Sequence, residues 1–266
     1  MLDKTFHFLS GLPRTGSTVI ESILQQNPNV YVSPTSPLLH LLNKNQDEFW
    51  KCPEVIANPV PDMLTNMSRG MIYGCWQHRP EKIIIDKHRG WGKNMPATTI
   101  VFGQEIKMVA TIRDLPSIMA SWLTLIRSEP VNTSRIRKSV IAKGGEANDD
   151  NLMAEMWFEN VLDCVESVCM AKQTASNRLM FVKYDDFVEN PKREILRIES
   201  FLELPSHEYD FENITNNNLN NDFEAYGFNN MHKVRPKVEK IAKHPREVLG
   251  DSLYYRFVDL EKQYGI

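Results

Sequence analysis

A glycine-containing turn between an apolar strand and a helix is the feature that most constrains the fold of this chain. Alternating apolar and aromatic residues at 5–9 predict a buried strand, and apolar residues recur at helical spacing over 19–24. Gly11 and Gly16 have the spacing of a nucleotide P-loop, but Ser17 stands where that motif has its lysine, and the cation Arg14 lies inside the loop. This pattern predicts an anion site at a strand-to-helix turn and argues against ATP chemistry.

The physical basis of that anion site is the backbone. Glycines let the chain approach an anion closely, and the free N–H groups of a helix N-terminus favour negative charge. The spacing of Thr18 and Glu21 predicts a capping box, and Asn27-Pro28 predicts the end of the helix. Glycines at this spacing also occur in ordinary strand-to-helix turns, so the loop alone leaves both interpretations open.

Composition limits the classes of function. The chain has 266 residues, of which 42% are hydrophobic and 24% charged, enough for a full core in a single domain over 1–266. Its net charge of −3 gives no general attraction to nucleic acid, and no apolar run has the roughly 20 residues of a membrane span. The strand at the N-terminus leaves no room for a signal peptide. The four cysteines form no Cys-x-x-Cys pair, which favours reduced thiols, a cytoplasmic location and no zinc site.

Apolar runs alternate with helical patterns along the chain. Strands are expected at 82–86, 106–112 and 179–182, and helices at 63–76, after Pro116, at 151–174, after Asn190-Pro191 and at 251–264. We assign no helix or strand to residues 28–61. We expect the polar segment 129–150 to be a mobile surface excursion and the polar segment 206–230 to be a loop. The alternation predicts an α/β fold, a P-loop-like three-layer arrangement with a central, mostly parallel sheet flanked by helices.

A second candidate anion site follows the strand at 106–112. Arg113 ends this strand, and ligands in open α/β sheets bind beyond the carboxyl ends of strands. Ser117 and Ser121 lie four residues apart on the next helix and therefore share a face. A guanidinium group and a hydroxyl suit a terminal phosphate. The alternative is a surface turn with exposed serines, but the order of the two motifs favours the phosphate site.

These two motifs together resemble those of the sulfotransferases that use 3′-phosphoadenosine 5′-phosphosulfate (PAPS). The resemblance rests on Gly11-Leu-Pro-Arg-Thr-Gly-Ser-Thr18, on Arg113-Asp-Leu-Pro-Ser-Ile-Met-Ala-Ser121, and on Val182-Lys-Tyr-Asp-Asp-Phe-Val-Glu-Asn-Pro191 before Phe201-Leu-Glu-Leu204. It extends from residue 5 to about 204. The Pro-Arg form of the loop looks more like the tyrosylprotein and carbohydrate branches than the cytosolic phenol enzymes.

The resemblance implies a role for each matching residue. Arg14 would contact the 5′-phosphate and the bridging oxygen, Lys87 the sulfonate, and Tyr184 would line the nucleotide site. Arg113 and Ser121 would hold the 3′-phosphate. The remaining implied nucleotide-binding residues are those of the loop and of a C-terminal basic segment, namely Pro13, Thr15, Gly16, Ser17, Thr18, Lys233 and Arg235. Lys87 and the C-terminal basic residues could also be solvated surface charges, and Tyr184 a half-buried aromatic at a strand end.

The chemistry of sulfonate transfer suits these residue types. Negative charge grows on the departing phosphate, so fixed cations such as Arg14 and Lys87 are needed there, and no metal ion is expected. The acceptor hydroxyl must lose a proton, and His88 is the first candidate base because histidine titrates near neutral pH. Adjacent residues of a strand point opposite ways, so Lys87 and His88 share a site only if the chain turns there.

Other bases are weaker candidates: Asp86, His40 and Glu48. The glutamate of the tyrosylprotein branch would fall near Thr35, which puts tyrosine sulfation in doubt.

The expected reaction is transfer of a sulfonate group from PAPS to a hydroxylated acceptor such as a carbohydrate, with adenosine 3′,5′-bisphosphate (PAP) as product. Two other classes remain: a P-loop phosphotransferase, which should carry a Walker lysine and need a divalent metal, and a silent nucleotide-binding module without a base. The expected partners are the nucleotide co-substrate and the acceptor, with no nucleic acid and no membrane span. The sequence leaves the oligomeric state open.

Overall fold

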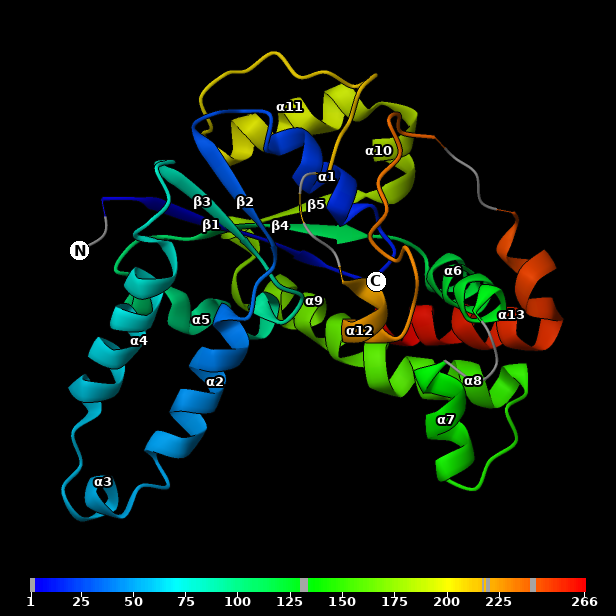
Figure 1. Ribbon diagram of the computed structural model, residues 1–266, viewed down its shortest axis with the longest axis horizontal. Coiled ribbons are helices and arrows are strands. Elements are labelled where there is room, and N and C mark those ends of the chain that lie inside the picture. Colours follow the sequence, from blue (N-terminus) through cyan, green and yellow to red (C-terminus); the bar gives the residue numbers. More distant parts are fainter. Residues whose placement is uncertain (1–2, 130–133, 217, 219–220, 240–242) are drawn as a thin grey trace.

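A five-stranded parallel sheet forms the centre of the described part of the protein (Figure 1). The structure is a computed structural model that describes residues 3–129, 134–216, 218, 221–239 and 243–266. Its strands run in the order β2-β3-β1-β4-β5, and every neighbouring pair is parallel. Their bounds are Thr5–Gly11 (β1), Val30–Thr35 (β2), Ile83–Lys87 (β3), Lys107–Ile112 (β4) and Leu179–Lys183 (β5).

Alternate side chains of the strands build two hydrophobic cores, one on each face of the sheet. Phe6 and Phe8 of β1 belong to the core under α5 (Trp91–Phe102) and α9 (Leu162–Thr174). Leu9 belongs to the core under α1 (Ser17–Leu24) and α11 (Pro191–Leu202). This period of two is what a pleated strand buried on both faces requires. The ring of Trp91 stacks on Phe8 with 3.8 Å between centroids, which fixes the start of α5 against β1.

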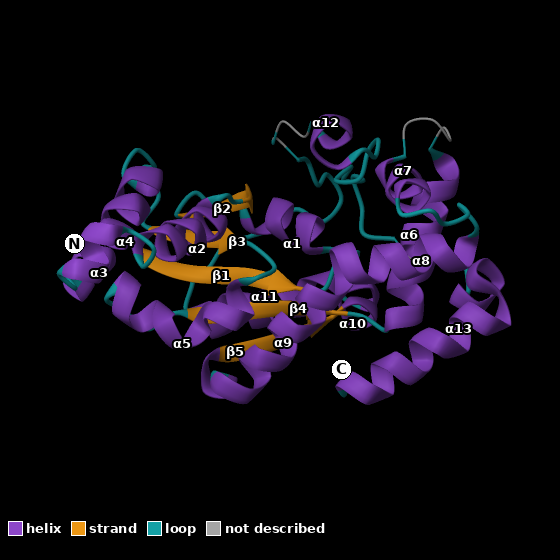
Figure 2. Cartoon of the chain, turned by 90° about the horizontal axis from the view of Figure 1, so that it is seen from below, coloured by secondary structure: helices purple, strands orange, loops and turns teal. Residues whose placement is uncertain are grey.

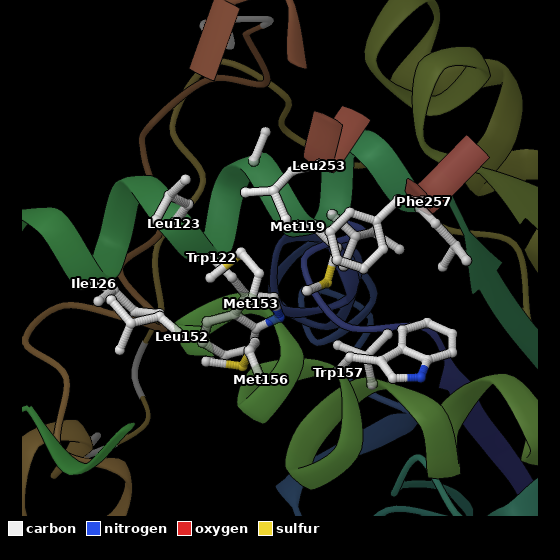
Figure 3. Close-up of a cluster of buried hydrophobic side chains, with 14 of the residues drawn as sticks. Met119, Trp122, Leu123, Ile126, Leu152, Met153, Met156, Trp157, Leu253 and Phe257 are labelled. Atoms are coloured by element: carbon white, nitrogen blue, oxygen red, sulfur yellow. The ribbon is translucent and has the colours of Figure 1, made fainter. Parts of the chain in front are cut away.

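A third core lies beyond one end of the sheet (Figure 3), where three helical segments meet. They are α6 (Leu115–Ser128), α13 (Pro245–Tyr264) and the run of α8 (Asp149–Met156) with a π-helical turn at Trp157–Val161 before α9. Figures 1 and 2 both place these helices at the opposite end of the molecule from an arm made of α2 (Leu38–Phe49), α3 (Pro53–Ala57) and α4 (Pro61–Trp76).

The predicted α/β three-layer fold is confirmed, and so are four strands. β2 was missed because Pro28 and Pro34 flank its short apolar run Val30-Tyr-Val32. The prediction that residues 28–61 hold no helix or strand is therefore wrong, since this stretch holds β2, α2 and α3. The predicted capping box is also wrong. Gly16 caps α1 without any side-chain hydrogen bond.

Two segments expected to be irregular contain helices. Ser134 accepts a hydrogen bond from the backbone N–H of Arg137 and starts α7 (Arg135–Ala142) inside the expected excursion 129–150, whose residues 130–133 lie outside the described part. The expected loop 206–230 contains α12 (Asp222–Tyr226), and residues 217, 219 and 220 fall outside the description. The C-terminal helix begins at Pro245, six residues before the expected start, with a non-helical Gly250 inside it. No helix in the described ranges is long and apolar enough to cross a bilayer.

Candidate active site

The glycine loop connects β1 to α1 at the carboxyl edge of the sheet. Gly11 has a φ of 115°, and a Cβ built there would lie 2.2 Å from the carbonyl oxygen of Thr111 in β4, so no larger residue fits. Arg14 and Gly16 also have positive φ values, 60° and 79°. These left-handed residues turn the loop back on itself and leave the N-terminus of α1 open to the site.

One cavity of about 420 Å³ lies over this loop, and we call it the arginine cavity. The structure brings nearly all of the predicted nucleotide-binding residues to its wall. These are Arg14, Thr15, Gly16, Ser17, Thr18, Arg113, Ser121, Tyr184, Lys233 and Arg235. Pro13 does not line the cavity. The two motifs and the C-terminal basic segment therefore share a single site, while the role of each residue stays a prediction.

Four arginines line the arginine cavity: Arg14, Arg89, Arg113 and Arg235. Burial, followed by the charges of Arg89 and Arg113, lowers the pKa of Arg14 to about 10. Within the described residues, Nη1 of Arg89 and Nε of Arg113 are buried without a hydrogen-bond partner. Concentrated positive charge with unpaired donors is unfavourable in an empty site, so the arrangement fits a polyanionic ligand.

Arg14 connects the glycine loop to two distant parts of the chain. Its Nε donates to Oγ of Ser121 at 3.1 Å, and its Nη1 donates to the carbonyl oxygen of Met231 at 3.0 Å. The guanidinium also lies 5.5 Å from the ring centroid of Trp122. These contacts hold the cation between the loop, α6 and the C-terminal segment.

Arg113 stacks over the ring of Tyr184, the first residue of α10 (Tyr184–Glu189), with 4.0 Å between Cζ and the ring centroid. Its Nη1 donates to the carbonyl oxygen of Arg14 at 3.3 Å. Asp114 caps α6 by accepting from the backbone N–H of Ser117 at 2.8 Å, which fixes the chain just after the arginine. The planar guanidinium is thus oriented before any ligand arrives.

Lys87, the last residue of β3, forms a buried ion pair with Glu21 of α1. Glu21 also accepts a hydrogen bond from the side chain of Asn218. The side chains of Lys87 and Glu21 are only 9% and 1% exposed. Burial raises the pKa of Glu21 and lowers that of Lys87, and the opposite charge of the partner counteracts each shift.

A smaller cavity of about 230 Å³ lies beside the arginine cavity, and we call it the side cavity. Thr18 and His232 line both cavities, so these two residues mark the boundary between them. The other residues of the side cavity are mostly polar: Glu21, Pro34, Thr35, Lys87, Asn221, Asp222, Ala225 and Tyr226.

The chain turns directly after β3. Lys87 and His88 can share one site only if such a turn is present. Both residues line a narrow crevice that also includes Arg89 and His232. The Nδ1 atom of His88 accepts a hydrogen bond from the backbone N–H of Gly90 at 3.0 Å. Burial, and next the charge of Arg89, lower the pKa of His88.

Sequence reasoning missed four residues at this site: Glu21, Arg89, Asp222 and His232. Arg89 directly follows Lys87-His88, and this adjacency was the signal that could have found it. Glu21 was assigned to a capping box. Asp222 lies in the polar segment 206–230 and His232 begins the C-terminal basic segment, and spacing alone predicts no contact between them.

Two further expectations concern metals and cysteines. Among the described residues, no group of three His, Cys, Asp or Glu side chains is arranged to hold a metal ion. The four cysteines at 52, 75, 164 and 169 are free thiols.

The comparisons with known proteins agree with this geometry. The family model for the sulfotransferase domain matches residues 4–251. A sulfotransferase domain of the Synechococcus PCC 7002 olefin synthase superposes with a TM-score of 0.58 at 17% identity, covering 99% of this chain and 94% of that one.

Mouse sulfotransferase SULT7A1, solved as a complex with PAP, gives a TM-score of 0.56 at 11% identity, covering 99% of this chain and 85% of that one. A sulfotransferase domain from the curacin biosynthetic pathway gives 0.56 at 15% identity and covers 97% of each chain. At these identities the likeness concerns the fold. A search of curated protein sequences found no match.

Proposed function

The chain belongs to the sulfotransferase domain family, and from this premise we propose that it transfers a sulfonate group from PAPS to a hydroxyl group of an acceptor. The observation that carries the proposal is the convergence of Arg14, Arg89 and Arg113 over the glycine loop. A nucleotide with phosphate groups at both its 3′ and 5′ positions matches such a site, because each end needs its own cluster of donors.

The two ends of the nucleotide are assigned from the position of each group. The loop amides and the hydroxyls of Ser17 and Thr18 suit the 5′-phosphosulfate, since they lie at the N-terminus of α1. Arg113 and Ser121 suit the 3′-phosphate, and Lys233 and Arg235 line the same cavity. In support, the mouse sulfotransferase of similar fold was solved with PAP.

In the transfer step, the bond from sulfur to the phosphate oxygen breaks and negative charge develops on the departing phosphate. Preorganised cations stabilise that charge more than they stabilise the bound donor. Arg14 and Arg89 supply them in the arginine cavity, and Lys87 lies beside the boundary to the side cavity. In this proposal the fixed cations of the chain do the work that a divalent metal does in kinases, so no metal ion is needed.

The acceptor would enter the side cavity. Polar side chains of that cavity, among them Thr35, Asn221 and Tyr226, offer hydrogen-bond partners to a hydroxylated molecule such as a carbohydrate. A phosphotransferase is not favoured, because the family model is that of a sulfotransferase domain and the loop lacks a Walker lysine. That the chain forms one domain over 1–266 and is cytoplasmic remains part of this proposal.

The test has two stages. Calorimetry in the presence of a chelator should show tight binding of PAP and much weaker binding of ATP. Labelled PAPS, incubated with a panel of sugars, alcohols and phenols, should then give a product that is 80 Da heavier. Tight ATP binding or an absolute metal requirement would contradict the proposal, and binding without any product would favour a silent nucleotide-binding module.

Arg14→Ala should lower kcat by roughly a hundredfold or more, because it removes a fixed cation from the developing charge. The exposed Arg69→Ala, on α4, is the matched control and should retain activity. Equal kinetics of Arg14→Ala and the wild type would refute the role of Arg14.

A further inference from the structure

His232 lies at the junction of the arginine cavity, the side cavity and the narrow crevice beside Lys87. A group in this position faces both the sulfonate end of a nucleotide in the first cavity and a molecule in the second. The function proposed above needs a proton acceptor at this boundary, because an alcohol attacks sulfur poorly until its proton is removed.

Asp222 fixes the orientation of His232 with both carboxylate oxygens. Oδ2 accepts a hydrogen bond from the backbone N–H of His232 at 2.8 Å, and Oδ1 lies 2.5 Å from Nδ1 of the ring. Both side chains are largely buried, 12% and 8% exposed. A carboxylate against Nδ1 places the proton of the neutral ring on that nitrogen, which leaves the lone pair of Nε2 to accept another proton.

His88 has the opposite arrangement. Its Nδ1 atom accepts a hydrogen bond from the backbone N–H of Gly90, which already occupies the lone pair of this ring nitrogen. The neutral ring must then carry its proton on Nε2 and has no free lone pair for a substrate proton. Of the two histidines in the crevice, His232 is therefore the one arranged to act as a base.

The surroundings of His232 favour the neutral form of its ring. Burial lowers its pKa most, the carboxylate of Asp222 opposes this shift, and the charges of Lys87 and Arg89 lower the pKa further. The ring of Tyr226 packs edge-on against the imidazole from α12. Asp222 and Tyr226 thus face His232 from α12, Lys87 faces it from the end of β3, and Arg89 from the turn after β3.

We propose that His232 is the general base of the reaction and that Asp222 is its positioning residue. The inference rests on the proposed sulfonate transfer. In that step Nε2 of His232 takes the proton of the acceptor hydroxyl as the acceptor oxygen forms its bond to sulfur. The bond from sulfur to the phosphate oxygen breaks, and PAP leaves with the electron pair. The imidazolium then returns its proton to solvent.

The test uses His232→Gln, Asp222→Asn and the rival His88→Gln, with the exposed His78→Gln as the matched control. For the best aliphatic acceptor found with labelled PAPS, His232→Gln should lower kcat by roughly 10²–10⁴-fold while PAP still binds in calorimetry. Asp222→Asn should lower kcat by about tenfold or more, because the ring loses its preferred tautomer.

Three readouts separate a base from a structural residue. The acidic limb of the wild-type kcat profile, which reports protonation of the base, should disappear in His232→Gln. Added imidazole should restore part of the activity of His232→Ala. A phenol already ionised at the assay pH should lose far less rate than the alcohol, since it needs no base.

Several results would overturn the assignment. Retained activity of His232→Gln together with loss in His88→Gln would transfer the role to His88. Parallel loss of PAP binding and turnover in His232→Gln, without imidazole rescue in His232→Ala, would make His232 a binding residue. Failure of the wild-type protein to bind PAP would instead refute the proposed function itself.

Discussion

Replacement of Lys87 by methionine separates the structural role of this lysine from its proposed catalytic role. The substitution keeps most of the length of the side chain but leaves the carboxylate of Glu21, which is 1% exposed, without its cation. Removal of one partner from a buried pair costs about 3–5 kcal/mol, and the lower value applies because Asn218 still donates to Glu21. At roughly 2–4 °C per kcal/mol, a loss of about 3 kcal/mol lowers Tm by about 6–12 °C.

The pH dependence of the loss has a definite sign. Burial raises the pKa of Glu21, and removal of Lys87 raises it further. A group with a raised pKa in the folded state contributes full stability below its unfolded pKa and loses it as the pH rises through the folded value. The deficit of Lys87→Met in the free energy of unfolding should therefore be larger at pH 8 than at pH 5.

The assay is a double-mutant cycle with Glu21→Gln, measured by urea denaturation and thermal melting. The double variant should recover about 1–2 kcal/mol relative to Lys87→Met, because no unpaired charge remains. It should not recover sulfonate transfer, since the cation is still missing. Lys93→Met, whose partly exposed ammonium pairs with Asp163 and Glu166, is the control and should change stability little. Additive losses at Lys87 and Glu21, or recovered turnover, would refute this reasoning.

Two further outcomes are expected. Arg113→Lys keeps the charge but loses the planar guanidinium and its stacking on Tyr184. Calorimetry should therefore show PAP binding about 10–100-fold weaker. An unchanged dissociation constant would contradict the assignment of Arg113 to the 3′-phosphate. Burial raises the pKa of Asp86 to about 6, so its contribution to stability falls as the pH rises through that value. Asp86→Asn, still able to accept from Trp91, should gain about 2 kcal/mol at pH 8, and denaturation showing no gain would count against it.

The sheet was largely predictable because strands buried on both faces read as apolar runs. Apolar runs at 82–86, 106–112 and 179–182 and the alternating apolar and aromatic residues at 5–9 indicated these strands, and each range overlaps a strand of the sheet. The edge strand β2 showed no such signal, because prolines flank a run of only three apolar residues. α7 and α12 are short and polar, so their apolar period is too brief to rise above a loop-like composition.

The arginine cavity was predictable for a different reason. The glycine loop and Arg113 both follow strands whose carboxyl ends meet at one edge of a parallel sheet, so order along the chain fixes their proximity. The partners of Lys87 and His232 depend on packing between a helix, a strand end and a polar segment. No spacing rule connects Glu21 to Lys87, 66 residues away. Such contacts become visible only once the chain is folded.

The hydrogen bond from Arg14 to Met231 joins residues that are 217 positions apart. On a ribosome that adds about 5–20 residues per second, roughly 10–40 s pass between synthesis of the first and the second. The glycine loop and the inner strands therefore leave the exit tunnel long before the segment that completes the arginine cavity. A ligand that needs contacts from both ends of this cavity cannot assist the early folding of the nascent chain, and it can stabilise the chain only after residue 231 has emerged.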